Sequence, residues 1–282
     1  MSAVPSEPPE LILEAKRGWR SLELGELWRY RELLWILALR DIQVRYKQTA
    51  IGAGWAILQP LLTMAVFVIF FGRLGNLAAT APPGIPYHLF VLAALLPWQL
   101  FTYALSSSAM SIVNGRALIT RVYFPRLAVP ASPLLCGLVD FGISFALLLF
   151  LMLVQGVPTG PRILLAPVFV LLGMLAATAV GVWLAALCAV YRDIKHIMPF
   201  LTQFWLLATP VAYPVSKVPA AWQWLYGLNP MVGVVDGFRW SVFPTADPPG
   251  IALLSTVFST SILLVGGLFF FRRMERTFAD MV

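Results

Sequence analysis

The chain has 282 residues, of which 60% are hydrophobic and only 12% are charged, and its formal net charge is +7. Soluble globular domains carry about 25% charged residues. This composition, with its apolar residues in long blocks, therefore predicts an integral membrane protein. The basic excess then reports membrane topology rather than nucleic-acid binding, and no nucleic-acid partner is expected.

Two segments precede the first long apolar run. Residues 1–22 are rich in proline and lack an apolar core, which excludes a secretory signal peptide and predicts a disordered cytosolic leader. Residues 23–50 place apolar side chains at helical spacing, but their uninterrupted apolar piece, LLWILAL, is too short to cross a bilayer. We predict an amphipathic helix at the cytosolic membrane interface. The alternative is an ordinary surface helix of a soluble domain.

Residues 51–282 form the predicted transmembrane domain. A bilayer core of about 30 Å needs about 20 apolar residues in a helix. Six stretches approach this length, although Pro210 and Pro214 interrupt the end of the fifth. With both termini in the cytosol, sixteen of the 20 Lys and Arg residues lie inside, as the positive-inside rule requires. The predicted spans are roughly 53–72, 87–113, 128–154, 163–190, 197–213 and 251–271.

The connection between the last two spans, about residues 215–245, is too aromatic for an ordinary loop and too broken for a span. It predicts two short re-entrant helices in the outer leaflet, separated at Asn229-Pro230. Irregular backbone at membrane depth is tolerated only within protein or beside a cavity. Gly233 and Gly237 have the GxxxG spacing of close helix packing, which is a weak indication in so short a segment.

The sequence carries no enzyme motif and predicts no catalytic residue. It has no GxxxxGK[ST] nucleotide loop, no GxSxG, no DxD or DxxD pair and no HExxH or CxxC metal motif. Cys136 and Cys188 are expected to be small buried hydrophobic residues. Asp140 lies in mid-span and must face protein or water. It is either a helix-packing residue, which we prefer, or part of a proton or substrate site.

Five stretches, in order, resemble the ABC-2 type permeases that export polysaccharides, the membrane subunits of O-antigen, teichoic acid and capsule exporters. The resemblance covers nearly the whole chain from residue 30 onward. It implies an all-α fold with six spans, an interfacial helix and periplasmic re-entrant helices. The stretches are LRDIQVRYKQTAIGAGWAILQPLLTMAVFVIFFGRL (39–74), LLPWQLF (95–101), LITRVYFPRLAVP (118–130), YRDIKHIMPFLTQFWLLATPVAYP (191–214) and LYGLNPMVGVVDGFRW (225–240).

The resemblance implies a function and an assembly. The chain would be the multi-pass inner-membrane subunit of a bacterial exporter that moves a polyprenyl-pyrophosphate-linked polysaccharide out of the cytosol. It would form a homodimer with two copies of a cytosolic ABC ATPase, which bind ATP and Mg²⁺, so the chain itself holds no cofactor. The alternatives are an ABC-2 permease for drugs or simple lipids, a membrane-bound transferase and a scaffold for synthesis enzymes.

It also implies four groups of functional residues. A coupling helix at about 114–127 would dock on the ATPase, whereas without the resemblance this stretch is a solvated basic loop. The pathway rings would stack on sugars, although aromatic residues in spans are usually structural. The docking residues are Arg116, Arg121, Tyr123, Phe124 and Arg126; the pathway rings are Phe67, Phe70, Trp98, Phe101, Tyr103, Phe200, Phe204 and Trp205; the pyrophosphate and lipid entrance has Arg40, Arg45 and Lys47; the outer gate has Trp222, Tyr226, Asn229 and Pro230.

Overall fold

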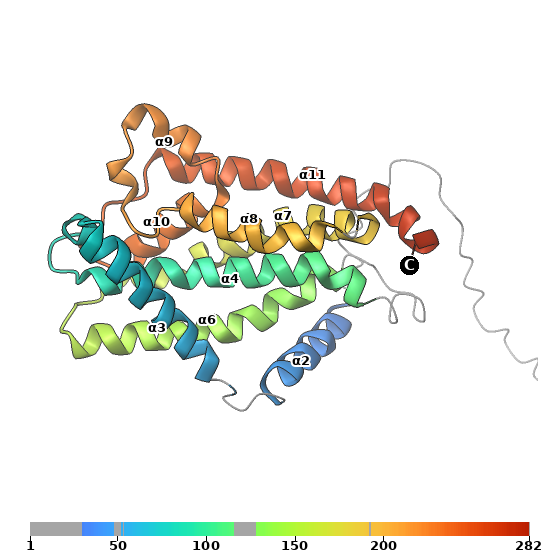
Figure 1. Ribbon diagram of the computed structural model, residues 1–282, viewed down its shortest axis with the longest axis horizontal. Helices are drawn as coiled ribbons and strands as arrows, with labels where there is room; N and C mark the ends of the chain where they lie inside the picture. The colour runs from blue at the N-terminus through green and yellow to red at the C-terminus, as the bar shows by residue number, and fades with distance from the viewer. Residues whose placement is uncertain (1–29, 48–51, 53, 116–127, 192, 282) are drawn as a thin grey trace, which may run out of the picture.

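The computed structural model describes residues 30–47, 52, 54–115, 128–191 and 193–281, with side chains up to residue 274. Over these residues every regular element is helical, which confirms the predicted all-α class (Figure 1). The elements are α2 (Arg31–Lys47), α3 (Gly54–Phe67), η1 (Val68–Leu74), η2 (Leu77–Thr80), α4 (Tyr87–Asn114), α6 (Ala128–Val154), η3 (Pro161–Leu165), α7 (Ala166–Val190), α8 (Ile194–Leu207), η4 (Val215–Lys217), α9 (Ala220–Tyr226), α10 (Pro230–Val242) and α11 (Ile251–Met281).

Five of the described helices are long and apolar enough to cross a membrane: Gly54–Leu74, Tyr87–Asn114, Val129–Val154, Pro161–Val190 and Ile251–Met274. The predicted count of six is not confirmed, because α8 has only 14 residues. At 1.5 Å per residue it is about 21 Å long, which is shorter than a bilayer core. The predicted fifth span continued to residue 213, but the helix ends at Leu207 and residues 208–213 form turns and bends.

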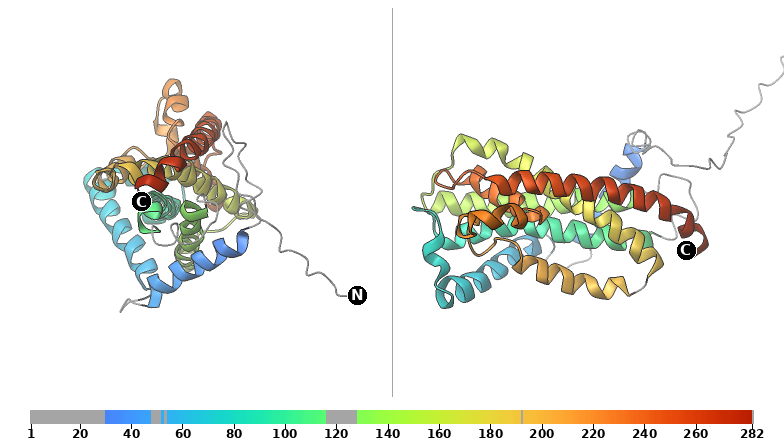
Figure 2. Two further views of the ribbon diagram at one scale, coloured as in Figure 1. Left: turned by 90° about the vertical axis from the view of Figure 1, so that its right-hand side faces the viewer. Right: turned by 90° about the horizontal axis from the view of Figure 1, so that it is seen from above.

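Helix α4 is the centre of the bundle. Its residues from Leu89 to Trp98 are all buried, because α6, α7, α10 and α3 surround this part of the helix. The sequence explains this position, since LFVLAALLPW is apolar on every side of the helix and such a helix is stable only when covered all round. Figure 2 shows α4 inside the ring formed by the other long helices.

The two ends of the bundle differ. At one end, which we call the C-terminal end, α4 and α7 finish and α6 and α8 begin (Figure 1). The opposite end holds the short elements η1 to η3 and the segment from residue 207 to 250 (Figure 1). Helices α3 and α8 lie on the same side of α4 in Figure 2, and in Figure 1 they diverge toward the C-terminal end. Among the described helices, these two border that side of the bundle.

Two short helices, α9 and α10, occupy the predicted re-entrant segment. Helix α10 is inserted between α7 and α11, and it needs both of its spaced glycines. A Cβ on Gly233 would lie 2.9 Å from the Leu253 Cα of α11, and a Cβ on Gly237 would lie 2.0 Å from the Phe169 ring of α7. The GxxxG spacing therefore marks close packing within the chain. Helix α9 projects outward, and Trp222 and Trp224 are exposed on it.

Candidate functional site

The predicted ATPase-docking residues Arg116, Arg121, Tyr123, Phe124 and Arg126 lie outside the described residues. Only the flanks of the coupling stretch are described. Helix α4 ends at Asn114, where Gly115 N–H donates to the Ser111 carbonyl, and α6 begins at Ala128. Both flanks lie at the C-terminal end of the bundle (Figure 1). The docking role of these five residues stays a prediction.

Helix α2 is anchored on α6 by a polar cluster. The Arg45 guanidinium lies 2.5 Å from a carboxylate oxygen of Asp140, and the Tyr46 hydroxyl donates a hydrogen bond to the other oxygen. The same guanidinium stacks over the Tyr103 ring of α4, 4.3 Å from its centroid. Asp140 thus joins α2 to α6 in mid-bundle. This arrangement favours the helix-packing role of Asp140 over a proton or substrate site.

The cluster shifts the acid–base behaviour of both α2 side chains. Burial lowers the pKa of the Arg45 guanidinium, but the Asp140 carboxylate and the Tyr103 hydroxyl outweigh it, so that this pKa is raised overall. Burial is also the main cause that raises the pKa of the Tyr46 hydroxyl, and its hydrogen bond to Asp140 adds to the shift. Tyr46 therefore remains a neutral donor and Arg45 a cation at physiological pH.

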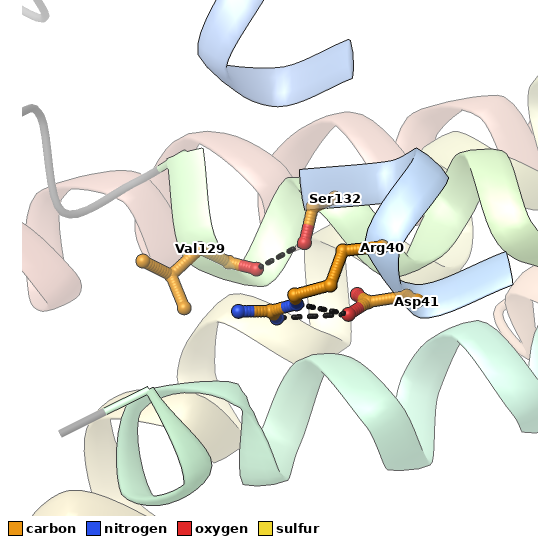
Figure 3. Close-up of polar contacts among 4 residues, drawn as sticks. All are labelled: Arg40, Asp41, Val129 and Ser132. Atoms are coloured by element: carbon orange, nitrogen blue, oxygen red, sulfur yellow. Dashed lines mark hydrogen bonds and ion pairs between the residues drawn. The ribbon is translucent and has the colours of Figure 1, made fainter. Parts of the chain in front are cut away.

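The other two predicted entrance cations have different surroundings. Arg40 donates to the carboxylate of its neighbour Asp41 at 2.8 and 3.1 Å, and Lys47 is exposed. Figure 3 shows the Arg40–Asp41 pair on α2 beside the first turns of α6, where the Ser132 hydroxyl donates to the Val129 carbonyl at 3.2 Å. The three cations therefore do not converge on one anion site. Their entrance role stays a prediction.

The apolar residues of α2 form two sets. The first set, Leu37 and Ala38, is buried, and α2 packs on α6. The second set, Trp35 and Ile36, is exposed at other positions around the helix. The interfacial role of α2 stays a prediction. The charged residues Arg31, Glu32 and Arg40 share the exposed surface with the second set.

The eight predicted pathway rings fall into three groups. Phe67, Trp98 and Phe101 are buried in the core, and Trp98 and Phe101 pack on each other with centroids 5.5 Å apart. Tyr103 and Trp205 are half-buried, and the Trp205 ring meets Phe101 edge-on at 5.1 Å. The exposed group is Phe70 on η1 with Phe200 and Phe204 on α8. Within one chain, only the second and third groups can be touched from outside.

Asn229 joins the end of α8 to the start of α10. Its side-chain oxygen accepts from the Met231 N–H at 3.0 Å, which caps α10, and from the Trp205 indole at 2.7 Å. Its amide nitrogen donates to the Ala208 carbonyl at 3.0 Å. Pro230 occupies the first turn of α10, where a missing N–H costs nothing. Two of the four predicted gate residues, Asn229 and Pro230, therefore have structural roles at the start of α10.

Of the other two gate residues, Trp222 is 58% exposed and Tyr226 is half-buried. The Tyr226 and Tyr213 hydroxyls lie 2.9 Å apart. This contact links α9 to the irregular segment 208–213. The gate role of Trp222, Tyr226, Asn229 and Pro230 stays a prediction.

Arg239 is a structural residue that the sequence analysis missed. It is 2% exposed and stacks over the Phe90 ring of α4 at 3.5 Å. Its guanidinium donates to the carbonyls of Phe90, Pro210, Val211 and Tyr213 at 2.5 to 3.3 Å. Three of these carbonyls belong to the non-helical segment after α8, where no helix supplies N–H donors to them. The available indication was an arginine within a largely apolar segment that has one other charged residue, Asp236; such an arginine must face protein.

The polar groups of the described residues show no metal centre, since no three His, Cys, Asp or Glu side chains gather where they could hold an ion. The chemistry of this bundle is instead ion pairing, hydrogen bonding and ring packing between helices. Such contacts position helices in a membrane and line passages between them.

The comparison with known families fits this architecture. The family described as ABC-2 type transporter matches residues 32–243, which run from α2 to the end of α10. The chain belongs to the ABC-2 type transporter family. It is thus a membrane subunit, or permease, and the predicted multi-pass inner-membrane protein is confirmed at that level.

Individual relatives cover most of the chain. It is 31% identical over 259 residues to the O-antigen export system permease protein RfbA of Myxococcus xanthus, which covers 91% of this chain and 98% of the relative. It is 25% identical over 241 residues to the polysialic acid transport protein KpsM of Escherichia coli, covering 85% and 92%. It is also 25% identical over 220 residues to the inner membrane transport permease YadH of Escherichia coli K12, covering 74% and 82%.

Proposed function

We propose that this chain is the membrane subunit of an exporter that moves a polysaccharide of the O-antigen type across the bacterial inner membrane. The observation that carries the proposal is the 31% identity to the O-antigen export permease of Myxococcus xanthus over 98% of that protein. The similarity to a polysialic acid transport protein supports a long glycan as cargo. We further propose that the glycan is carried on polyprenyl pyrophosphate.

The energy source is a separate subunit in this proposal. Two copies of a cytosolic ABC ATPase bind ATP and Mg²⁺, and each docks on the coupling stretch at about 114–127 of one permease. Tyr123 and Phe124 supply apolar anchors there, and Arg116, Arg121 and Arg126 supply charge-assisted bonds to carboxylates. Both chain termini face the cytosol. Support comes from the flanks of this stretch, which lie at the same end of the bundle as the end of α11 (Figure 1).

Two permeases form the pathway between them in this proposal. Its walls are α3, α4 and α8, and α9 and α10 close its outer mouth. The arrangement of α3 and α8 on one side of α4 supports this assignment (Figure 2). So does the exposure of Phe200 and Phe204 on α8 and of Phe70 on η1, which continues the span of α3; each is about 60% exposed.

A deletion strain tests the transport step. We expect full-length lipid-linked polymer to accumulate on the cytosolic face of the inner membrane, detected by mass spectrometry of lipid extracts and by lectin binding to vesicles of either orientation. Loss of polymer synthesis would instead indicate a transferase or scaffold. An unchanged glycan profile would indicate export of a drug or simple lipid.

A double variant tests the docking claim in the same strain. Tyr123→Ala with Phe124→Ala is expected to insert normally but to abolish export and to release the ATPase on purification. Phe258→Ala is the control, because Phe258 is 63% exposed on α11, far from the docking stretch in the sequence. Normal export by the double variant would refute docking through these two residues.

A further inference from the structure

Residues 208–219, which we call the α8–α9 linker, are held in place by side chains of two other helices. The carbonyls of residues 210–213 are four consecutive acceptors in this linker. The Arg239 guanidinium of α10 donates to three of them, and the Tyr87 hydroxyl of α4 donates to the fourth, that of Ala212, at 2.9 Å. Irregular backbone inside a membrane protein needs such partners. The position of the linker therefore depends on its contact with α10.

A buried positive charge lies beside the α8–α9 linker. The Arg239 guanidinium is 2% exposed and forms no ion pair with any of the described residues. Burial lowers the pKa of this guanidinium, and the Asp236 carboxylate, one turn earlier on α10, is the largest cause that opposes the effect. Asp236 thus balances the charge of Arg239 without touching it.

The Asp236 carboxyl lies where α10 meets the α8–α9 linker. It is half-buried, and α10 is outside the five candidate membrane spans. The carboxyl accepts a hydrogen bond from the backbone N–H of Val215, which belongs to the linker. Asp247, exposed in the loop before α11, and the Tyr226 hydroxyl of α9 also interact with it electrostatically. A carboxyl group of α10 is therefore in direct contact with the linker and close to a second acid.

The remaining elements that pack on α10 bring no further charge to this carboxyl. Residues 166–187 of α7 and 251–271 of α11 contain no titratable side chain. The other titratable groups at this end of the bundle are directed elsewhere: Tyr87 to the Ala212 carbonyl, His88 to Gln155, Arg162 to the Trp240 ring, Tyr213 to Tyr226 and Lys217 to solvent.

The surroundings of Asp236 favour its protonated form. Burial raises the pKa of the carboxyl from 3.8 to about 6; Arg239 and the Val215 N–H act against this rise, and Asp247 adds to it. A carboxyl group that is exposed to water keeps its ordinary pKa. The packed arrangement therefore binds the proton more tightly than an arrangement in which water reaches Asp236. This preference is fully present below pH 3.8 and is lost as the pH rises through about 6.

We propose that Asp236 makes the α8–α9 linker respond to the pH of the compartment outside the inner membrane. With the carboxyl protonated, the linker stays packed on α10. When the carboxyl loses its proton, an arrangement in which η4 moves away and water reaches the carboxylate becomes more favourable, because a buried charge is costly. Helix α9 follows the linker directly, so the same step would move the helix that is proposed to close the outer mouth. The proposal uses the proposed orientation and is independent of the cargo.

Thiol labelling of the full-length chain tests the response. Cys136 and Cys188 are first replaced by Ala, because both are buried free thiols. Val215→Cys then reports the contact with Asp236, since Val215 is buried, and Ser216→Cys, at the exposed next residue, is the matched control. The probe is a charged methanethiosulfonate, applied to right-side-out membrane vesicles on both sides of pH 6.

The ratio of the two labelling rates is the quantity to compare, because both thiols share the ordinary pH dependence of thiolate formation. A direct effect of the carboxylate on the nearby thiol cannot imitate an increase, since a like charge disfavours the thiolate and would lower the ratio. Ala212→Cys, also at a buried position of the linker, takes the place of Val215→Cys if that variant fails to accumulate.

The ratio of Val215→Cys to Ser216→Cys labelling is expected to rise severalfold as the pH increases through about 6. Asp236→Asn keeps the size of the side chain but cannot ionise, so the ratio should stay low at every pH. Asp247→Asn should move the midpoint to lower pH without abolishing the rise, because Asp247 contributes to the raised pKa of Asp236. A purely structural role of Asp236 would not produce this shift.

Two results would overturn the pH response: a ratio that is constant with pH in the parent chain, or an unchanged rise in Asp236→Asn. Labelling of Ser216→Cys in inside-out but not in right-side-out vesicles would refute the outward orientation, and with it the response to the outer compartment. The export function is tested separately, because the labelling needs neither polymer nor ATP. If a strain without the chain still exports polymer, the export function fails and the labelling result is unaffected.

Discussion

Arg45 of α2 and Asp140 of α6 form an ion pair with 2.5 Å between their closest atoms, and Tyr46 donates to the same carboxylate. The side chains are 36% and 19% exposed, so the pair is neither fully solvated nor fully buried. It connects α2 to the bundle at the level of Tyr103 on α4. The position of α2 on the bundle therefore depends on a carboxylate in the middle of a membrane helix.

Breaking this pair is expected to loosen α2. Asp140→Asn should lower the free energy of unfolding in detergent by about 1–2 kcal/mol, between the values for exposed and buried ion pairs. It should also speed proteolysis between α2 and α3. Thermal unfolding and timed digestion measure the two effects.

A double-mutant cycle isolates the pair from the rest of the cluster. Arg45→Ala and Asp140→Ala together should cost less than the sum of the single changes. Arg40→Ala is the matched control, because the exposed Arg40 pairs only with its neighbour in sequence, Asp41, among the contacts described. Additive effects of the two single changes would show that Arg45 and Asp140 do not stabilise each other.

Arg239 should be among the most sensitive positions in the chain. Arg239→Met is expected to leave the carbonyls of Phe90, Pro210 and Val211 without a donor inside the protein. Because each buried unsatisfied group costs about 1–3 kcal/mol, the total loss should be about 3 kcal/mol or more. Arg239→Lys should rescue little of it, since an ammonium group cannot reproduce the planar fork.

The measurement is the midpoint of thermal unfolding, together with the yield of monodisperse protein. Arg162→Met serves as control, because Arg162 is also stacked on a ring, that of Trp240 at 5.2 Å, but is exposed. Equal behaviour of the two variants would contradict the role assigned to Arg239.

Gly237→Ala is expected to be strongly destabilising. The added Cβ would lie 2.0 Å from the Phe169 ring, so α7 and α10 would have to move apart. Overpacking of this kind typically costs about 1–3 kcal/mol. Gly142→Ala offers a comparison on α6, where a Cβ meets nothing within 4 Å. Alanine there should be neutral or raise the unfolding midpoint, through a helix propensity gain of up to about 1 kcal/mol. Similar midpoints for both variants would argue against close packing at Gly237.

The sequence predicted the elements that depend on long-range hydropathy. The long apolar runs predicted the bounds of the helices at 87–113 and 128–154 to within one residue, because a helix that crosses a bilayer needs an apolar stretch of matching length. The end of α8 was placed at 213 instead of Leu207, because hydropathy cannot report where backbone hydrogen bonding stops. Pro210 and Pro214 were the only indication of that break.

The partners of polar side chains were not predictable in the same way. Asp140 was recognised as a residue that must face protein, but Arg45 lies far from it in sequence and no spacing links them. Arg239 was not singled out, because topology rules count charges and carry no information on burial. Aromatic residues give the weakest indication, since a ring in a span can be part of the core, a lipid contact or part of a pathway, and the sequence does not distinguish these roles.

The last prediction separates these roles for two rings that the sequence placed in one group. Trp98 is 4% exposed and packs on Phe101, whereas Phe204 is 59% exposed on α8 beside Phe200, with ring centroids 4.4 Å apart. Trp98→Ala should therefore lower stability by about 3–5 kcal/mol and reduce export through loss of folded protein. Phe204→Ala should leave stability within about 1 kcal/mol of the parent chain and reduce export per folded molecule.

The measurement compares surface polymer, normalised to the folded permease recovered with its ATPase, for Trp98→Ala, Phe204→Ala and a Phe150→Ala control. Phe150 is 60% exposed on α6, so it matches Phe204 in size and exposure but lies on a different helix. A normalised flux that falls for Phe204→Ala alone would support contact between α8 and the moving glycan. Equal flux for Phe204→Ala and Phe150→Ala would show that the Phe204 ring has no role in transport, because the two variants remove the same exposed apolar surface.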